Sequence, residues 1–202
     1  MASTTEKPAD PEYRSEAAAP PTPPPAGLLD YFQADVALRF LLFASSLVAI
    51  VVIVTSQQTE LAPTQPLGGP PLVPKPAKFK YSPAYIYFVT AFSVAGLYSI
   101  LTTLASISVM SRPDLKLKFL LHFIFWDTLI LGIVASATGT AGAVAYSSLK
   151  GNDHFNWNEV CNVYDKFCRH LAGSLAVALF GSVVAVLLVW LSATSLHSRI
   201  PK

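Results

Sequence analysis

The sequence predicts an all-α membrane protein, a bundle of four transmembrane helices. Three observations favour this class: 52% of the 202 residues are hydrophobic, only 13% are charged, and the hydrophobic residues gather into four stretches of bilayer length. We expect spans at about 31–55, 83–110, 117–146 and 171–196, with loops at 56–82 and 147–170. The net charge of +2 is small and scattered, which argues against nucleic acid as a partner.

Residues 1–29 form a Pro/Ala-rich tail that we expect to be disordered, because the block Ala17–Pro25 cannot build a core. A regulatory phosphosite at Ser15 or Thr22, or docking of the proline run to a partner, is the alternative interpretation. The tail contains no apolar stretch of the kind found in signal peptides, which predicts that the N-terminus stays in the cytosol.

The first span is predicted to begin at Tyr31 with Asp30 as its cap, and its apolar run is interrupted by Arg39. The loop at 56–82 is rich in proline and contains a glycine pair, so we expect an extended, irregular connection without a fold of its own. Ser82 and Pro83 are a typical cap and first residue for the second helix.

The second and third spans are joined by a short polar connection, which predicts that they are antiparallel neighbours. The third span carries one carboxylate, Asp127, and the fourth is free of charge throughout. An even number of spans places both termini on one side. Basic residues crowd into the short connection, so we expect the N-terminus and the tail 198–202 to be cytosolic.

Arg39 and Asp127 are the two charges placed well inside apolar stretches. If their helices start near Tyr31 and Lys118, both lie on the order of 13 Å along the helix from the same membrane face. A lone charge in hydrocarbon is unfavourable by about 2.5–3.5 kcal/mol, so we expect an ion pair that fixes the helices together. A transport or proton-relay role, or snorkelling of Arg39 to the headgroups, are the alternatives.

The two cysteines, Cys161 and Cys168, share one loop. If this loop faces an oxidising compartment, a disulfide is the simplest expectation. Seven residues of straight helix would separate the two Cα atoms by about 10 Å, so the segment 162–167 must turn. The rival interpretation is a metal site formed with His154 and His170, although its spacing lacks the paired cysteines of structural zinc sites.

Small residues recur at every fourth position in three of the spans. They are Ala91, Ala95, Ser99 and Thr103 in the second, Ala135, Gly139 and Ala143 in the third, and Ser174, Ala178 and Ser182 in the fourth. Such stripes let helices approach closely in lipid. They indicate packing within one bundle, contact between copies of the chain, or both, and we expect a homo-oligomer.

The sequence contains no Walker A loop, no GxSxG and no HExxH motif. We therefore expect no enzyme activity, no catalytic residues, no cofactor and no metal.

The membrane segment resembles the plant Casparian strip membrane domain proteins, and more closely their CASP-like relatives. The resemblance rests on Arg39 in ALRFLLF, on Asp127 in HFIFWDTLILGIVASATGTAGAVAY, and on the loop WNEVCNVYDKFC with Cys161 and Cys168. It covers about 36–196. Arg39 and Asp127 match the family's intramembrane Arg and Asp, and the two cysteines match its second-loop cysteines.

The resemblance implies a MARVEL-like four-helix fold and a plasma-membrane scaffold. Such a scaffold would form homo-oligomers, or hetero-oligomers with related family members, and could recruit cell-wall-modifying enzymes. The first loop departs from the strip-forming members, because it is rich in proline and glycine and lacks their short aromatic-rich motif. The alternative function is a small-solute or ion channel with its selective point at the level of Arg39 and Asp127.

Overall fold

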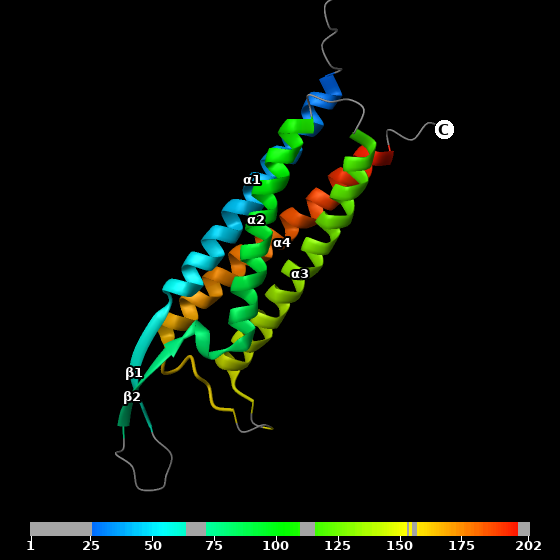
Figure 1. Ribbon diagram of the computed structural model, residues 1–202. Coiled ribbons are helices and arrows are strands. Elements are labelled where there is room, and N and C mark those ends of the chain that lie inside the picture. Colours follow the sequence, from blue (N-terminus) through cyan, green and yellow to red (C-terminus); the bar gives the residue numbers. More distant parts are fainter. Residues whose placement is uncertain (1–25, 64–71, 110–115, 153, 155–156, 198–202) are drawn as a thin grey trace, which may run out of the picture.

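The computed structural model describes residues 26–63, 72–109, 116–152, 154 and 157–197. Most of them belong to four helices, α1 (Ala26–Thr55), α2 (Pro83–Val109), α3 (Lys116–Lys150) and α4 (Asp165–His197). Figure 1 shows these helices side by side in one elongated bundle, with the start of α1 and the end of α4 together. We call this the terminal end of the bundle, and the opposite end the loop end.

The helices pack in a ring. α1 contacts α2 and α4 along its length, and α3 contacts the same two helices. Helices α1 and α3 therefore lie across the diagonal of the bundle, and both run from the terminal end to the loop end (Figure 1). Any direct link between them must reach through its centre.

The outer surface of the bundle is apolar. All four helices are long and apolar enough to cross a membrane, yet only 28 to 39% of the most apolar stretch of each is buried in the bundle. Large side chains such as Phe40, Leu97 and Trp190 are exposed. A surface of this kind is stable against lipid and unfavourable in water. The predicted class, an all-α membrane protein with four spans, is confirmed.

Three of the four helices, α1, α3 and α4, are longer than the predicted spans. α1 begins at Ala26 and not at Tyr31, so Asp30 lies within the helix and not at the position before its first residue. α3 continues to Lys150, and α4 starts at Asp165, six residues before the predicted start. Charged residues mark where the apolar run ends, but the i→i−4 hydrogen bonds of a helix can continue past that point.

The loop at 56–82 has a fold of its own, which corrects the prediction of an irregular connection. Strands β1 (Gln57–Pro63) and β2 (Leu72–Lys78) pair antiparallel, and a single 3₁₀ turn, η1 (Phe79–Tyr81), leads into α2. Prolines usually break strands because they lack a backbone N–H. Here Pro63, Pro74 and Pro76 fall on every second residue pair, and these pairs exchange no backbone hydrogen bonds between the two strands.

The three stripes of small residues divide between two environments. On α2, Ala91, Ala95 and Ser99 are buried and Thr103 is half-buried, and on α4 Ser174 and Ala178 are buried and Ser182 is half-buried. On α3, Ala135, Gly139 and Ala143 are all exposed. Packing within the bundle therefore accounts for the stripes on α2 and α4, but not for the stripe on α3.

The predictions for the tail up to residue 25, the connection at 110–115 and the last five residues lie outside the described ranges.

Candidate functional site

Arg39 is the largest fully buried side chain of the bundle, with 1% of its surface exposed. It projects from α1 across the diagonal to α3. There its Nη1 and Nη2 donate to Asp127 Oδ1 and Oδ2, each at 3.2 Å. This forked geometry matches a guanidinium to a carboxylate through two parallel hydrogen bonds. The structure thus brings together the two charges singled out from the sequence.

Asp127 accepts hydrogen bonds from all three other helices. Besides Arg39 of α1, Tyr98 Oη of α2 donates to Oδ1 at 2.7 Å, and Ser192 Oγ of α4 donates to Oδ2 at 3.2 Å. Arg39 Nη1 also donates to Thr102 Oγ1 of α2 at 2.9 Å. All four helices therefore meet at one carboxylate–guanidinium pair, which we call the clasp.

The clasp includes a second carboxylate that sequence reasoning missed. Arg39 Nε donates to Asp35 Oδ1 and Oδ2 at 3.2 and 3.0 Å, one helical turn earlier on α1. Ser106 Oγ of α2 donates to Asp35 Oδ2 at 3.3 Å. The spacing i, i+4 between an acid and an arginine was the available signal. Asp35 lies directly before the apolar run and so is not among the charges placed well inside it.

The chemistry available to the clasp is limited, because its groups are already occupied. Every buried side-chain nitrogen and oxygen of the described residues has a hydrogen-bond partner. The guanidinium stacks over the Phe123 ring, with Cζ 5.2 Å from the centroid. A fully paired buried network rigidifies a bundle and specifies one arrangement of its helices.

A disulfide joins Cys161 and Cys168 at the loop end, with the Cα atoms 5.7 Å apart. Residues 161–163 form a turn, and Cys168 lies in the first turn of α4. The chain therefore turns between the cysteines, as the spacing required. Disulfide-bonded sulfurs offer no thiolate, so the alternative metal site with His154 and His170 is wrong.

The residues enclosed by the disulfide hold the β-hairpin in place. Tyr164 Oη donates to the carbonyl of Lys75 on β2 at 2.9 Å. The backbone N–H of Phe167 donates to Gln58 Oε1 on β1 at 2.9 Å, and Ser56 Oγ donates to the carbonyl of Phe167 at 3.4 Å. A two-stranded hairpin is marginal alone, so these contacts stabilise it.

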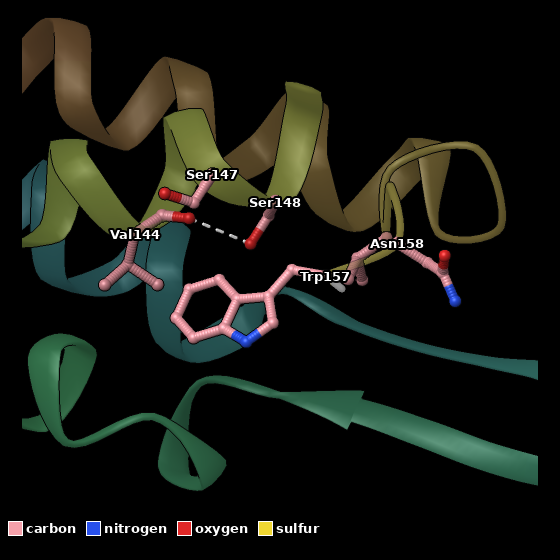
Figure 2. A pocket seen from close by; sticks show the side chains of 6 residues that line it. Val144, Ser147, Ser148, Trp157 and Asn158 are labelled. Atoms are coloured by element: carbon pink, nitrogen blue, oxygen red, sulfur yellow. Dashed lines mark hydrogen bonds between the residues drawn. The ribbon is translucent and has the colours of Figure 1, made fainter. Parts of the chain in front are cut away.

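A hollow of about 380 Å³ opens beside the same loop. Figure 2 shows the Trp157 indole facing Val144 and Ser148 of α3, while the Asn158 side chain points away. Ser147 Oγ and Ser148 Oγ donate to carbonyls of their own helix at 3.0 and 2.9 Å. With its hydroxyls turned back onto α3, the hollow presents little to orient a ligand.

Gly151 shapes the turn that carries Trp157. Its φ is +65°, and a Cβ added there would lie 2.8 Å from the carbonyl oxygen of Trp157. We expect Gly151→Ala to destabilise the protein by about 1–2 kcal/mol in thermal unfolding, through the left-handed backbone and this clash. Gly173→Ala, in open space on α4, is the matched control and should not destabilise. Equal stability of both variants would contradict the role of this turn.

The fold and the site define a class: a multi-pass membrane protein of four helices that are joined at one buried ionic network. The family model for the Casparian strip membrane protein domain matches residues 31–184. The chain therefore belongs to this family, as the resemblance in its sequence indicated.

The chain is similar to plant proteins along its whole length. It is 64% identical to CASP-like protein 1D2 of Glycine max, with all of both chains covered. It is 59% identical to CASP-like protein 1D1 of Vitis vinifera over 85% of this chain and 82% of that one. The identity to CASP-like protein 1D2 of Arabidopsis thaliana is 46%, over 93% and 96%. No solved structure matches the chain significantly.

Proposed function

We propose that this protein is a non-enzymatic scaffold of the plasma membrane that associates laterally with copies of itself and with related family members. The observation that carries the proposal is the outward stripe on α3, formed by Ala135, Gly139 and Ala143, on a bundle whose other stripes are used internally. A bundle that had only to hold itself together would gain nothing from small residues on its lipid face.

The α3 stripe is suited to close helix contact. A Cβ added at Gly139 would meet nothing within 4 Å, and Ser136 and Thr140 beside it are also exposed. Association in lipid depends on van der Waals packing and on short interhelical distances, because lipid removes the hydrophobic driving force. A flat surface without large side chains satisfies both conditions, so a second helix can approach α3 closely.

The clasp supports the same function. Lateral association requires a surface of constant shape, and the clasp fixes α1 and α3 across the diagonal while engaging α2 and α4. A channel with its selective point at this level has less support, since Arg39 and Asp127 are 1% and 3% exposed and engaged with each other.

The orientation that belongs to this proposal has the N-terminus in the cytosol. With a cytosolic N-terminus, the terminal end faces the cytosol and the loop end, with its disulfide, faces the oxidising exterior. Cell-wall-modifying enzymes are the candidate partners on that side, as the family resemblance implies. Homo-oligomers and hetero-oligomers would then present many loop ends in one plane.

The proposal predicts that Gly139→Leu weakens self-association. A leucine there would hold a neighbouring helix away, so we expect the association constant to fall by about tenfold, for a loss of roughly 1.4 kcal/mol. Counting of photobleaching steps in single vesicles, at low protein density, measures the subunit number directly.

The matched control is Gly173→Leu, because Gly173 is also exposed with open space around it but lies on α4. We expect this variant to associate like the parent protein. Equal oligomer fractions for Gly139→Leu and the parent would refute the α3 surface, and monomers throughout would refute the scaffold.

A further inference from the structure

The two strands of the β-hairpin differ in what their outer edges offer. Antiparallel strands alternate between pairs that exchange backbone hydrogen bonds and pairs that do not. Proline has no N–H, so the pairs Thr59↔Pro76, Leu61↔Pro74 and Pro63↔Leu72 belong to the second kind. The backbone groups of these residues therefore point away from the hairpin, to its two outer edges.

The outer edge of β2 is blocked, because two successive outward positions are Pro74 and Pro76. The outer edge of β1 is open, and it presents the N–H and C=O groups of Gln57, Thr59 and Leu61. These three residues are exposed, and within the described ranges no other backbone segment hydrogen-bonds to this edge. Prolines commonly protect edge strands from pairing with another chain, and here they protect the outer edge of β2 but leave the outer edge of β1 able to pair.

We propose that the open edge of β1 binds an extended, proline-free segment of a partner protein, which adds a third, antiparallel strand to the hairpin. Main-chain hydrogen bonds would supply the affinity, and alternate side chains the selectivity. Glu60 is exposed and has Lys75 opposite it on β2, so a Lys or Arg in the added strand would stand beside the carboxylate on the open side. An apolar residue would cover Leu61, which is 59% exposed.

The edge is held rigidly enough for such binding. Only Ser56 separates β1 from α1, and its hydroxyl donates to the carbonyl of Phe167. Gln58 accepts from the N–H of Phe167 through its side chain and donates to Glu60 Oε1 at 2.9 Å. The strand is thus ordered before a partner arrives, which lowers the entropic cost of binding.

A second copy of the chain is a poor occupant. The hairpin projects away from the bundle at the loop end (Figure 1), so copies in one membrane carry their β1 strands in the same direction. In a parallel pair of strands, only one of two directly opposite residues turns its N–H and C=O toward the other strand. A two-fold axis along the membrane normal would place identical residues of the two copies opposite each other, so the two β1 strands could not form this pattern. Pairing with the β2 edge of a neighbour would meet Pro74 and Pro76, which lack donors.

The inference does not depend on lateral association, because a single copy has the complete edge. The test uses the full chain in lipid nanodiscs and a capped, fluorescent peptide, Val-Lys-Val-Thr-Val, whose valines face Leu61, Thr59 and Gln57. One control peptide carries N-methyl groups on the three valines, which removes the donors that face β1. The other carries them on the lysine and threonine, whose N–H groups face away.

We expect saturable binding of the parent peptide below about 1 mM, measured by fluorescence anisotropy. The valine-methylated peptide should bind about tenfold more weakly or worse, and the other control within about twofold, because only the first loses hydrogen bonds to β1. Equal binding of the two methylated peptides, or no saturable binding of the parent peptide, would overturn the proposal.

The edge is also tested from the protein side. Thr59→Pro removes one outward donor and leaves the ladder intact, whereas Thr59→Val keeps the donor. We expect binding to fall about tenfold in the first variant and to persist in the second. Slow hydrogen exchange at the Glu60 N–H, which faces β2, verifies that the hairpin is still formed. Unchanged binding to Thr59→Pro with that protection intact would refute the edge.

Discussion

Replacing Asp127 with alanine is expected to destabilise the bundle by about 3 kcal/mol. The change leaves Asp35 as the one carboxylate that still pairs with the buried Arg39 guanidinium, and it removes the acceptor of Tyr98 and Ser192. The matched control is Asp35→Ala, which also deletes a carboxylate from Arg39. The Asp35 side chain is 21% exposed and contacts fewer partners, so we expect a loss of only about 1 kcal/mol.

Unfolding of the two variants by titration with a denaturing detergent compares these losses. A double variant, Arg39→Met with Asp127→Leu, should recover part of the loss of Asp127→Ala because no unpaired charge remains buried. Exchanging the two charges is a poorer test, since it would place a carboxylate at position 39 one turn from Asp35. An Asp127→Ala variant as stable as Asp35→Ala would contradict the clasp.

Replacing Cys161 and Cys168 together with serine is expected to destabilise the loop end by about 2.5 kcal/mol, from the chain entropy of the eight-residue ring. The consequence should appear on the hairpin, because Tyr164 and Phe167 inside the ring hold β2 and β1. We expect amide hydrogen exchange to accelerate over 57–63 and 72–78 while the centre of the bundle stays protected.

Tyr164→Phe is the informative companion to the serine variant. It removes one hydrogen bond, worth about 1 kcal/mol, and leaves the disulfide intact. Faster exchange of the hairpin in both variants, and more so in the serine variant, would fit the proposed coupling. Unchanged hairpin exchange after loss of the disulfide would show that the two loops are independent.

Much of the site could be predicted from the positions of charges. Counting residues from the helix starts placed Arg39 and Asp127 at one depth. In the structure α1 starts at Ala26 and α3 at Lys116, so Arg39 and Asp127 lie 13 and 11 residues after the starts of their helices. These positions are about 20 and 17 Å along the two helices, so the two depths still agree. The diagonal arrangement of their helices could not be predicted, because helix order around a bundle depends on side-chain packing between distant segments.

Two features were missed for opposite reasons. Asp35 was missed although its spacing of four residues from Arg39 was informative, because only charges well inside the apolar stretches were considered. The hairpin was not predicted because a proline-rich segment usually lacks strands, although Pro74 and Pro76 are spaced by two and fit one edge of a strand.

The stripes of small residues show where periodicity stops being informative. The stripes on α2, α3 and α4 share one spacing, yet Ala95 and Ala178 are buried and Gly139 faces outward. A fourfold repeat identifies a face on a helix, but it does not say whether that face meets its own bundle or another one.

Lateral association is tested most directly by the mobility of the fluorescently tagged protein in the plasma membrane of plant cells, measured by recovery after photobleaching. The proposed scaffold predicts slow, incomplete recovery for the parent protein and for Gly173→Leu, and faster recovery for Gly139→Leu. Recovery of the parent protein as fast as that of a freely diffusing four-helix monomer would contradict it.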